Sequence, residues 1–201
     1  MTDVDGVVQS IRDGKLAVLP TDTVYGLVCA ASNREPAADL YRLKGRAAIQ
    51  PTAVVFGAVG VLSKHLPELD SRVLAIVEEL LPGPYTLVVP NPTHRFAWLT
   101  EGRPGSIGLR VPILAGVAAS VVERLEAVVA TSANLRGGQD PRTLAEVPPE
   151  ILAGVAAAVD GGELPGTPST VIDVTGVEPL IIRAGAGDPA RALARVVAAR
   201  A

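Results

Sequence analysis

The chain has 201 residues, of which 48% are hydrophobic and 19% charged, and its formal net charge at pH 7 is −3. This length and apolar fraction indicate one globular domain with a sizeable core and argue against a disordered chain, while an aromatic content of 3% predicts an aliphatic core. The single cysteine excludes an internal disulfide and a cysteine-based zinc site, and the mildly acidic balance argues against polyanion binding by the whole surface but permits a local basic cleft.

Hydrophobic spacing and turn residues predict the secondary structure in chain order. Apolar residues at positions 4, 7, 8 and 11 predict a first helix, which Gly14 ends. Strands over 16–20 and 26–31 follow, and then a helix with Asn33 as its cap and Pro36 in its first turn. The later elements are a strand over 52–56, helices over 58–66 and 70–81, a strand over 85–90, a loop over 91–105, a strand over 106–112, a helix over 113–125, a strand over 127–132, a short helix over 148–155, strands over 156–159, 170–175 and 179–183, and a helix over 188–200.

The order of these elements predicts the fold class. Alternating strands and helices indicate an α/β domain. Several strands are separated by loops rather than by helices, so we expect a mixed sheet rather than a strictly parallel one. No internal repeat or low-complexity linker divides the chain, and we expect a single domain over residues 1–201.

Signals for metal binding and for membranes are weak. The two histidines, His65 and His94, sit apart and lack the spacing of metal ligands, so no protein-held metal is expected. No apolar run approaches the roughly 20 residues needed to cross a bilayer, and the acidic N-terminal segment lacks the basic start of a signal peptide. We therefore expect a cytoplasmic protein with no membrane partner.

The common nucleotide and nucleophile motifs are absent. The chain has no P-loop and no nucleophile elbow. Residues Gly185–Ala190 match G-x-G-x-x-A between a strand and a helix, but the chain ends before the second strand and the acidic residue that a dinucleotide site needs about 20 positions on. We interpret these glycines as a turn at the start of a helix.

Four polar stretches and two arginines interrupt otherwise apolar segments. They are PTDTVYG at 20–26, LKGR at 43–46, TSAN at 131–134, PSTVID at 168–173, and the residues Arg110 and Arg183. Each lies in or at the end of a predicted strand or helix, and strand ends on one side of an open α/β sheet converge on a ligand crevice. Together they predict a cationic, hydroxyl-rich pocket with few carboxylates, suited to a nucleoside triphosphate and a small acid.

Two of these stretches have structural as well as functional interpretations. Lys44 and Arg46 flank a glycine at a helix C-terminus, where cations gain about 0.3–1 kcal/mol, but the same pair could clamp an anion. Ser132 and Asn134 are typical of turns and caps, and they could equally supply neutral donors to phosphate or ribose oxygens.

The remaining candidates are two hydroxyls and two arginines. Ser169 and Thr170 enter an apolar strand, where hydroxyls can donate to an anion without adding charge. Arg110 lies between Leu109 and Val111, so either a core carboxylate satisfies it or it projects into a cleft and binds an anionic ligand. The same two alternatives apply to Arg183.

In this order, the polar blocks resemble a known family. The blocks PTDTVYGL, KGR, GPYTLVVP, SIGLRVP, TSANLRGG, STVIDVTG and IIRAG, spread over about residues 14 to 187, are similar to those of the YrdC-like L-threonylcarbamoyladenylate synthases. The resemblance implies a twisted mixed sheet flanked by helices, with a large concave, positively charged cavity. It implies condensation of L-threonine, bicarbonate or CO2 and ATP to threonylcarbamoyl-adenylate and pyrophosphate, with Mg2+ bound with the ATP. The product would serve N6-threonylcarbamoylation of adenosine 37 in tRNA through a downstream tRNA threonylcarbamoyltransferase complex, with weak tRNA binding as a further expectation.

The resemblance also implies roles for individual residues. Contacts to threonine fall on Thr21, Thr23, Tyr25 and Arg110, although Arg110 could bind either the substrate carboxylate or phosphate. Contacts to ATP, and the catalytic charges, fall on Lys44 and Arg46, with further ATP contacts from Ser132, Asn134, Ser169 and Arg183.

Three positions depart from the family pattern. Asp22 stands where glutamate is usual, and Ala47 and Thr52 replace the usual proline and leucine. Because proline limits backbone freedom, the loop after Arg46 is expected to be more mobile than in the family.

Two rival functions remain open on the sequence. A concave basic surface could bind double-stranded RNA or tRNA without catalysis. A related enzyme could form a carbamoyl-adenylate from carbamoyl phosphate, although the zinc-binding cysteine motifs of such proteins are absent here. Dependence of pyrophosphate release on threonine separates the two enzymes, and salt-dependent RNA affinity without pyrophosphate release would favour the binding module.

Overall fold

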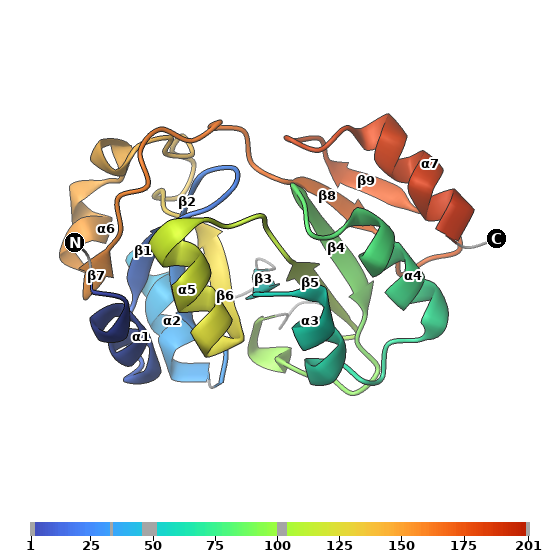
Figure 1. Ribbon diagram of the computed structural model, residues 1–201, viewed down its shortest axis with the longest axis horizontal. Helices are drawn as coiled ribbons and strands as arrows, with labels where there is room; N and C mark the ends of the chain where they lie inside the picture. The colour runs from blue at the N-terminus through green and yellow to red at the C-terminus, as the bar shows by residue number, and fades with distance from the viewer. Residues whose placement is uncertain (1–2, 33, 46–51, 100–103, 200–201) are drawn as a thin grey trace.

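The computed structural model describes residues 3–32, 34–45, 52–99 and 104–199. Within them, the strands form one continuous sheet in the order β7-β1-β2-β6-β3-β5-β4-β8-β9 (Figure 1). The strands are β1 (Ala17–Pro20), β2 (Tyr25–Ala30), β3 (Ala53–Phe56), β4 (Tyr85–Pro90), β5 (Ser106–Arg110), β6 (Ala127–Ser132), β7 (Ala157–Ala158), β8 (Thr170–Asp173) and β9 (Leu180–Arg183). Three neighbouring pairs, β1–β7, β3–β5 and β4–β8, are parallel and the other pairs are antiparallel, which confirms the mixed sheet.

Helices surround the sheet close to the predicted positions. They are α1 (Val4–Arg12), α2 (Arg34–Leu43), α3 (Val59–His65), α4 (Ser71–Leu80), α5 (Gly116–Leu125), α6 (Pro149–Ala153) and α7 (Pro189–Ala199), with short 3-10 turns η1 (Ala97–Leu99) and η2 (Leu144–Glu146). The start of α4 follows from its sequence, because the Asp70 side chain caps it by accepting a 2.9 Å hydrogen bond from the backbone N–H of Val73. No helix within the described residues is both long and apolar enough to cross a bilayer.

Some boundaries differ from the prediction for identifiable reasons. The helix predicted over 113–125 begins only at Gly116, because Ala115 is extended and the backbone N–H of Ile113 donates to the Asp22 carboxylate. The predicted strand over 156–159 shortens to the two residues of β7, and the predicted loop over 91–105 contains η1. The predicted cap Asn33 lies outside the described residues.

The glycines of the G-x-G match permit close packing beside α7. A Cβ on Gly185 would lie 2.1 Å from the backbone oxygen of Pro168, and one on Gly187 would lie 2.2 Å from the ring of Tyr85. Only residues without a side chain fit there. The interpretation of these glycines as a turn at a helix start is confirmed, since α7 begins two residues after Gly187.

The two faces of the sheet are covered unequally. Apolar side chains of α1 and α5 pack on one face, over β1, β2, β6 and β3, in a core that includes Val8, Val28, Val55 and Val121. The opposite face packs against α2, α3, α4 and α7 in a larger aliphatic core. The first face therefore keeps a part without helical cover, over β5, β4 and β8 and over the ends of β2, β6 and β3 that lie beyond this core.

Candidate active site

A cavity of about 530 Å³ lies on this uncovered part of the sheet. Small residues on neighbouring strands form its floor, because strand alternation points Gly26, Ala53, Gly108 and Ala130 toward it. The polar and charged residues of its lining are Thr21, Lys44, Thr52, Thr86, Arg110, Thr131, Ser132, Asn134, Arg136, Ser169 and Arg183. No Asp, Glu, His or Cys occurs in the described lining, so the chemistry it offers is that of cations and hydroxyls.

Lys44 follows the C-terminus of α2 and meets the end of β6. It is 4% exposed, and its Nζ donates to the backbone oxygen of Ser132 and, at 2.8 Å, to Asn134 Oδ1. The hydroxyl of Ser132 also donates to Asn134 Oδ1 at 2.8 Å, and the amide of Asn134 donates to the backbone oxygen of Gly138 and to Asp140. These contacts fix a lysine, a hydroxyl and an amide together at one wall of the cavity.

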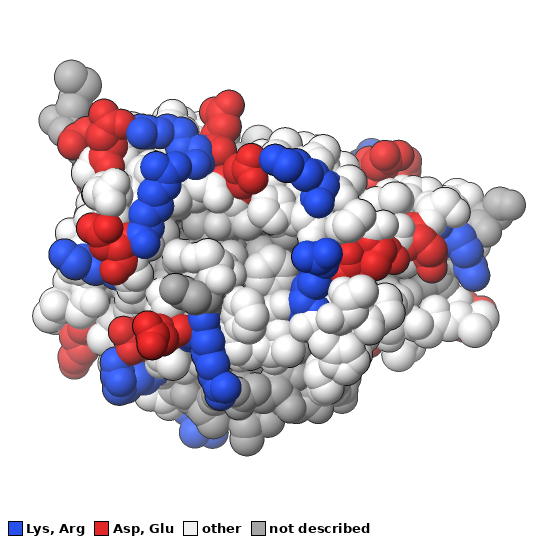
Figure 2. All heavy atoms as spheres, turned by 90° about the horizontal axis from the view of Figure 1, so that it is seen from below, with Lys and Arg blue, Asp and Glu red and all other residues white. Residues whose placement is uncertain are grey.

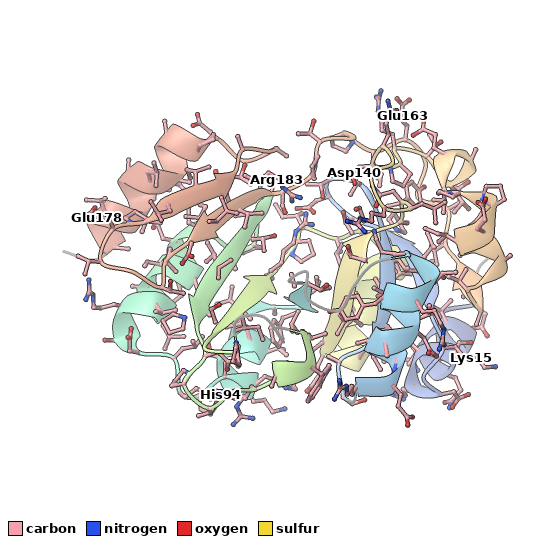
Figure 3. The ribbon with its side chains drawn as sticks, turned by 180° about the vertical axis from the view of Figure 1, so that it is seen from behind. Lys15, His94, Asp140, Glu163, Glu178 and Arg183 are labelled. Atoms are coloured by element: carbon pink, nitrogen blue, oxygen red, sulfur yellow. The ribbon has the colours of Figure 1, made fainter. Side chains whose placement is uncertain are left out.

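A second polar group comes from the C-terminal strands. The hydroxyls of Thr86 and Ser169 lie 2.8 Å apart, and Arg183 donates to the backbone oxygen of Ser169 from Nη2 at 2.8 Å and from Nε at 3.2 Å. Figure 3 shows Arg183 directed into the space between the two halves of the molecule, while Lys15, His94 and Glu178 lie at the periphery. Since the partners of Arg183 are neutral oxygens, its charge remains available to an anion.

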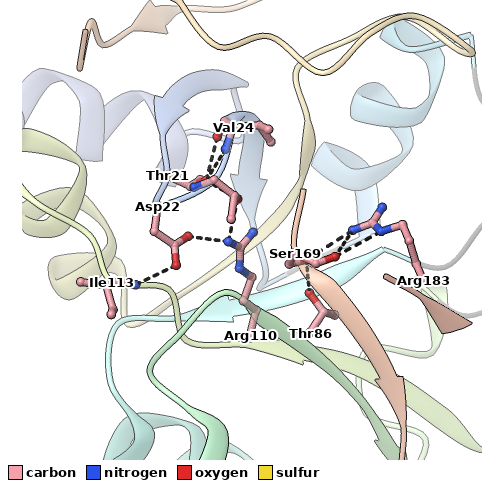
Figure 4. Close-up of polar contacts among 9 residues, drawn as sticks. Thr21, Asp22, Val24, Thr86, Arg110, Ile113, Ser169 and Arg183 are labelled. Atoms are coloured by element: carbon pink, nitrogen blue, oxygen red, sulfur yellow. Dashed lines mark hydrogen bonds and ion pairs between the residues drawn. The ribbon is translucent and has the colours of Figure 1, made fainter. Parts of the chain in front are cut away.

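A third group surrounds Arg110 at the end of β5 (Figure 4). Its Nη2 donates to the carboxylate of Asp22 and, at 2.8 Å, to the hydroxyl of Thr23. The Thr21 and Thr23 hydroxyl oxygens lie 3.0 Å apart, and Thr21 donates to the backbone oxygen of Val24 at 2.7 Å. The sequence left open whether a carboxylate satisfies Arg110 or whether it projects into a cleft. In the structure it does both, since the side chain pairs with Asp22 and also lines the cavity.

Burial shifts the pKa values of this ion pair. Desolvation raises the pKa of Asp22 from its ordinary 3.8, although the Arg110 guanidinium and the backbone N–H of Ile113 oppose that shift. Desolvation also lowers the pKa of Arg110, and the positive charge of Arg183 acts in the same direction. Both arginines line the cavity, so an anion bound between them would offset their mutual repulsion.

The structure separates the residues of the PTDTVYG stretch. Thr21 lines the cavity, whereas Thr23 is fully buried and its hydroxyl faces Arg110. Tyr25 does not line the cavity, because strand alternation in β2 points it with Leu27 into the core on the opposite face. Its hydroxyl is 3.0 Å from the Asp160 carboxylate, 2.8 Å from the backbone oxygen of Gly162, and accepts a 2.9 Å hydrogen bond from the backbone N–H of Gly161.

Tyr25 thereby holds the crossing segment, residues 160–169, which connects β7 to β8 across the molecule (Figure 1). Two further backbone hydrogen bonds attach this segment: Leu164 N–H donates to Arg142 O at 2.8 Å, and Gly166 N–H donates to Thr23 O at 2.9 Å. The segment ends at Ser169, so it delivers one wall of the cavity.

The cavity thus brings together Thr21, Lys44, Arg110, Ser132, Asn134, Ser169 and Arg183 of the predicted site. Arg46 lies outside the described residues, as does Ala47. Sequence reasoning missed Arg136, which lines the cavity two residues after Asn134 and whose backbone N–H donates to Lys44 O at 3.3 Å. It also missed Thr86. The only sequence signal for these two residues was that Arg136 lies within the block TSANLRGG and Thr86 within the block GPYTLVVP.

Charges elsewhere on the surface are mixed. On the face drawn in Figure 2, lysine and arginine side chains lie interspersed with aspartate and glutamate. The described residues on that face form no continuous cationic surface, in keeping with the net charge of −3.

Comparison with known proteins gives consistent matches over most of the chain. Residues 9–185 match the Sua5_yciO_yrdC family model, described as telomere recombination. A threonylcarbamoyl-AMP synthase of Pyrococcus abyssi is 33% identical over 192 residues, which is 93% of this chain and 55% of that protein. This chain spans about half the length of the curated relatives from P. abyssi and Bacillus subtilis that it matches.

Two solved structures share the fold closely. The crystal structure of P. abyssi Sua5 complexed with L-threonine aligns with a TM-score of 0.86 and 29% identity, covering 96% of this chain and 57% of that one. The crystal structure of Escherichia coli YciO aligns with a TM-score of 0.82 and 25% identity, covering 94% and 92%.

Proposed function

The chain belongs to the Sua5/YciO/YrdC family, and we propose that it is a threonylcarbamoyl-AMP synthase. In this reaction L-threonine, bicarbonate or CO2 and ATP give threonylcarbamoyl-adenylate and pyrophosphate. The observation that carries the proposal is the cavity itself, where Lys44, Arg110, Arg136 and Arg183 converge with hydroxyls and without a lining carboxylate. Such a lining suits two anionic substrates that must be brought together.

The cations act on the transferring nucleotidyl group. The carbamate oxygen of the N-carboxylated threonine attacks the α-phosphorus of ATP, and the bond to the leaving pyrophosphate breaks. Lys44 and Arg183 would stabilise the charge that develops on the phosphate oxygens, and Ser169 would donate a neutral hydrogen bond. Ser132 and Asn134 would hold the Lys44 ammonium in place, since both accept hydrogen bonds from it. No covalent protein intermediate is needed, which agrees with the absence of nucleophile motifs.

Arg46 would complete the phosphate clamp with Lys44. It follows Lys44 by two residues and adds a forked donor to a point charge. Its role rests on the sequence, because its position lies outside the described residues.

Mg2+ would enter with the nucleotide. The described lining has no carboxylate, and no cluster of three or more His, Cys, Asp or Glu occurs within the described residues. This donor set fits a metal held chiefly by the phosphates, whose contribution when bound is to neutralise their charge.

L-threonine would lie at the Arg110 end of the cavity. The P. abyssi relative was crystallised with L-threonine, and Thr21 and Arg110 offer a hydroxyl and a guanidinium in the corresponding fold here. The arrangement of Tyr25 favours an indirect role for that residue, through the crossing segment.

The product places the protein before a tRNA-modifying step. An activated threonylcarbamoyl group would be passed to adenosine 37 of tRNA by a threonylcarbamoyltransferase complex, and any tRNA contact by this chain would be weak because its net charge is −3. We expect the protein to act in the cytoplasm, together with the enzymes that modify tRNA.

The decisive experiment measures pyrophosphate release from ATP while L-threonine and bicarbonate are added one at a time. We expect release only when both are present, together with a product of the mass of threonylcarbamoyl-adenylate. Release that needs carbamoyl phosphate instead of threonine would identify the other carbamoyl-adenylate chemistry. Salt-dependent RNA binding without any pyrophosphate release would identify a binding module and refute the proposal.

A further inference from the structure

A buried carboxylate stands behind the arginine at one end of the cavity. The side chains of Asp22 and Arg110 are only 12% and 11% exposed, and one Asp22 oxygen accepts from Arg110 Nη2. The other oxygen accepts a 3.3 Å hydrogen bond from the backbone N–H of Ile113. Arg110 lines the cavity and Asp22 does not. The carboxylate is therefore placed to act on the arginine rather than on a ligand.

The donors of Arg110 are unequally used. Nη2 serves both Asp22 and Thr23, and Nε is buried without a hydrogen-bond partner. No hydrogen bond between described residues uses Nη1. Asp22 and Thr23 thus fix one end of the guanidinium and leave its other terminal nitrogen for a ligand, as Figure 4 shows in outline.

The two ends of the cavity differ in charge. Arg110 carries its own counter-charge in Asp22, whereas Arg183 hydrogen-bonds to the neutral oxygens of Ser169. A polyphosphate with several negative charges is favoured where cations lack a carboxylate partner and is repelled near Asp22. An amino acid has a single carboxylate and an amino group. Its charges therefore complement those of a guanidinium that has a carboxylate beside it.

We propose that Asp22 is a positioning residue that holds Arg110 to receive the carboxylate of the amino acid substrate. This inference rests on the proposed function, because it takes an amino acid to be a substrate. It assigns Arg110 to the amino acid rather than to the phosphates, and it gives Asp22 a role through Arg110 alone.

The test compares two ligands that differ only at the carboxylate. Binding of L-threonine and of L-threoninamide, whose carboxylate is replaced by a neutral amide, is measured by titration calorimetry on wild type and Asp22→Asn. We expect the variant to bind L-threonine about 10- to 100-fold more weakly, as for loss of a charge-assisted contact, and to bind L-threoninamide within about twofold of wild type. Asp22→Glu should recover part of the lost L-threonine affinity.

Asp5→Asn is the matched control. Asp5 makes the same kind of pair with Arg124, but on the exposed surface where α1 meets α5, and neither residue lines the cavity. This variant should bind both ligands as wild type does. An equal loss of both ligands in Asp22→Asn, or unchanged L-threonine binding, overturns the proposal.

A second variant covers the case in which Asp22→Asn does not fold. Thr23→Val keeps the side-chain shape and removes the other acceptor on Arg110 Nη2. We expect it to weaken L-threonine about 3- to 10-fold and to spare L-threoninamide; equal effects on both ligands, or none, contradict the proposal. Failure of the proposed function would appear in wild type, as absent pyrophosphate release, whereas failure of the positioning role would appear only in the variants.

Discussion

Replacing Tyr25 with phenylalanine tests whether this residue anchors the crossing segment or contacts substrate. The substitution removes only the hydroxyl, which is fully buried and meets Asp160, Gly161 and Gly162. It leaves the ring in the core beside Leu27. The hydroxyl anchors a segment that ends at Ser169. Its loss should therefore lower the free energy of unfolding and leave one wall of the cavity less firmly attached.

The size of the effect follows from the groups left behind. The backbone N–H of Gly161 loses its acceptor and the carboxylate of Asp160 loses a donor, and each such loss costs about 1–3 kcal/mol when water cannot compensate. Asp160 and Gly161 are exposed on their outer side, so water recovers part of this. We expect a net loss of about 1–2 kcal/mol, which at a urea m-value of about 2 kcal/mol/M lowers the unfolding midpoint by about 0.5–1 M.

Two measurements on Tyr25→Phe separate the interpretations. Urea unfolding followed by circular dichroism gives the stability, and initial rates of pyrophosphate release give the KM for L-threonine. An anchoring residue predicts the midpoint shift with a threonine KM within about twofold of wild type, since the hydroxyl contacts only residues 160–162 and the Gly166–Thr23 hydrogen bond still holds the segment beside Arg110. Unchanged stability with a threonine KM raised tenfold or more would refute the reasoning and return Tyr25 to the substrate site.

Three further predictions concern single residues. Lys44→Ala should lower the rate of pyrophosphate release by about 10²–10³, as for loss of one preorganised charge, and an unchanged rate would exclude the clamp. Burial raises the pKa of the Cys29 thiol to about 12, so native protein should resist a thiol-reactive dye at pH 8 and react only after unfolding; rapid native labelling would contradict this. Burial also raises the pKa of Asp22 above 3.8, so the folded state binds that proton more tightly than the unfolded state. Relative to Asp22→Asn, wild type should therefore become more stable as the pH falls through the raised pKa toward 3.8. Urea titrations of both proteins at pH 6 and pH 4 check this, and a wild type that loses stability relative to the variant at pH 4 would contradict it.

Local signals in the sequence sufficed for most of the fold. The spacing of apolar residues and the cap at Asp70 located α4 to within one residue at each end, because a helix of that kind depends on contacts three and four residues apart. The same reasoning placed α5 too early. Its first turn is displaced by a contact between Ile113 and Asp22, which are 91 residues apart in the chain, and no local pattern encodes such a contact.

The candidate site was predictable in its chemistry and less so in its geometry. Polar residues at the ends of strands and of one helix identified Lys44, Ser132 and Arg183 as cavity residues. The hollow itself depends on small residues such as Gly108 facing one side of the sheet, and on the crossing segment reaching over from β7. Both features follow from the order of the strands in the sheet, which cannot be derived from local sequence patterns. Arg136 was missed because an arginine in a glycine-rich turn is ordinarily a surface residue; it is exposed here too, although it also lines the cavity.

The PTDTVYG stretch shows why a motif does not assign one role to all its members. Strand alternation and the turn before β2 send Thr21 to the cavity, Asp22 and Thr23 behind Arg110, and Tyr25 to the opposite face. These positions are nevertheless coupled. The backbone oxygen of Thr23 accepts from Gly166 of the crossing segment while its hydroxyl accepts from Arg110. A displacement of the crossing segment would therefore reach the Arg110 end of the cavity through Thr23 and the Arg183 end through Ser169, so that one stretch of loop supports both ends of the cavity.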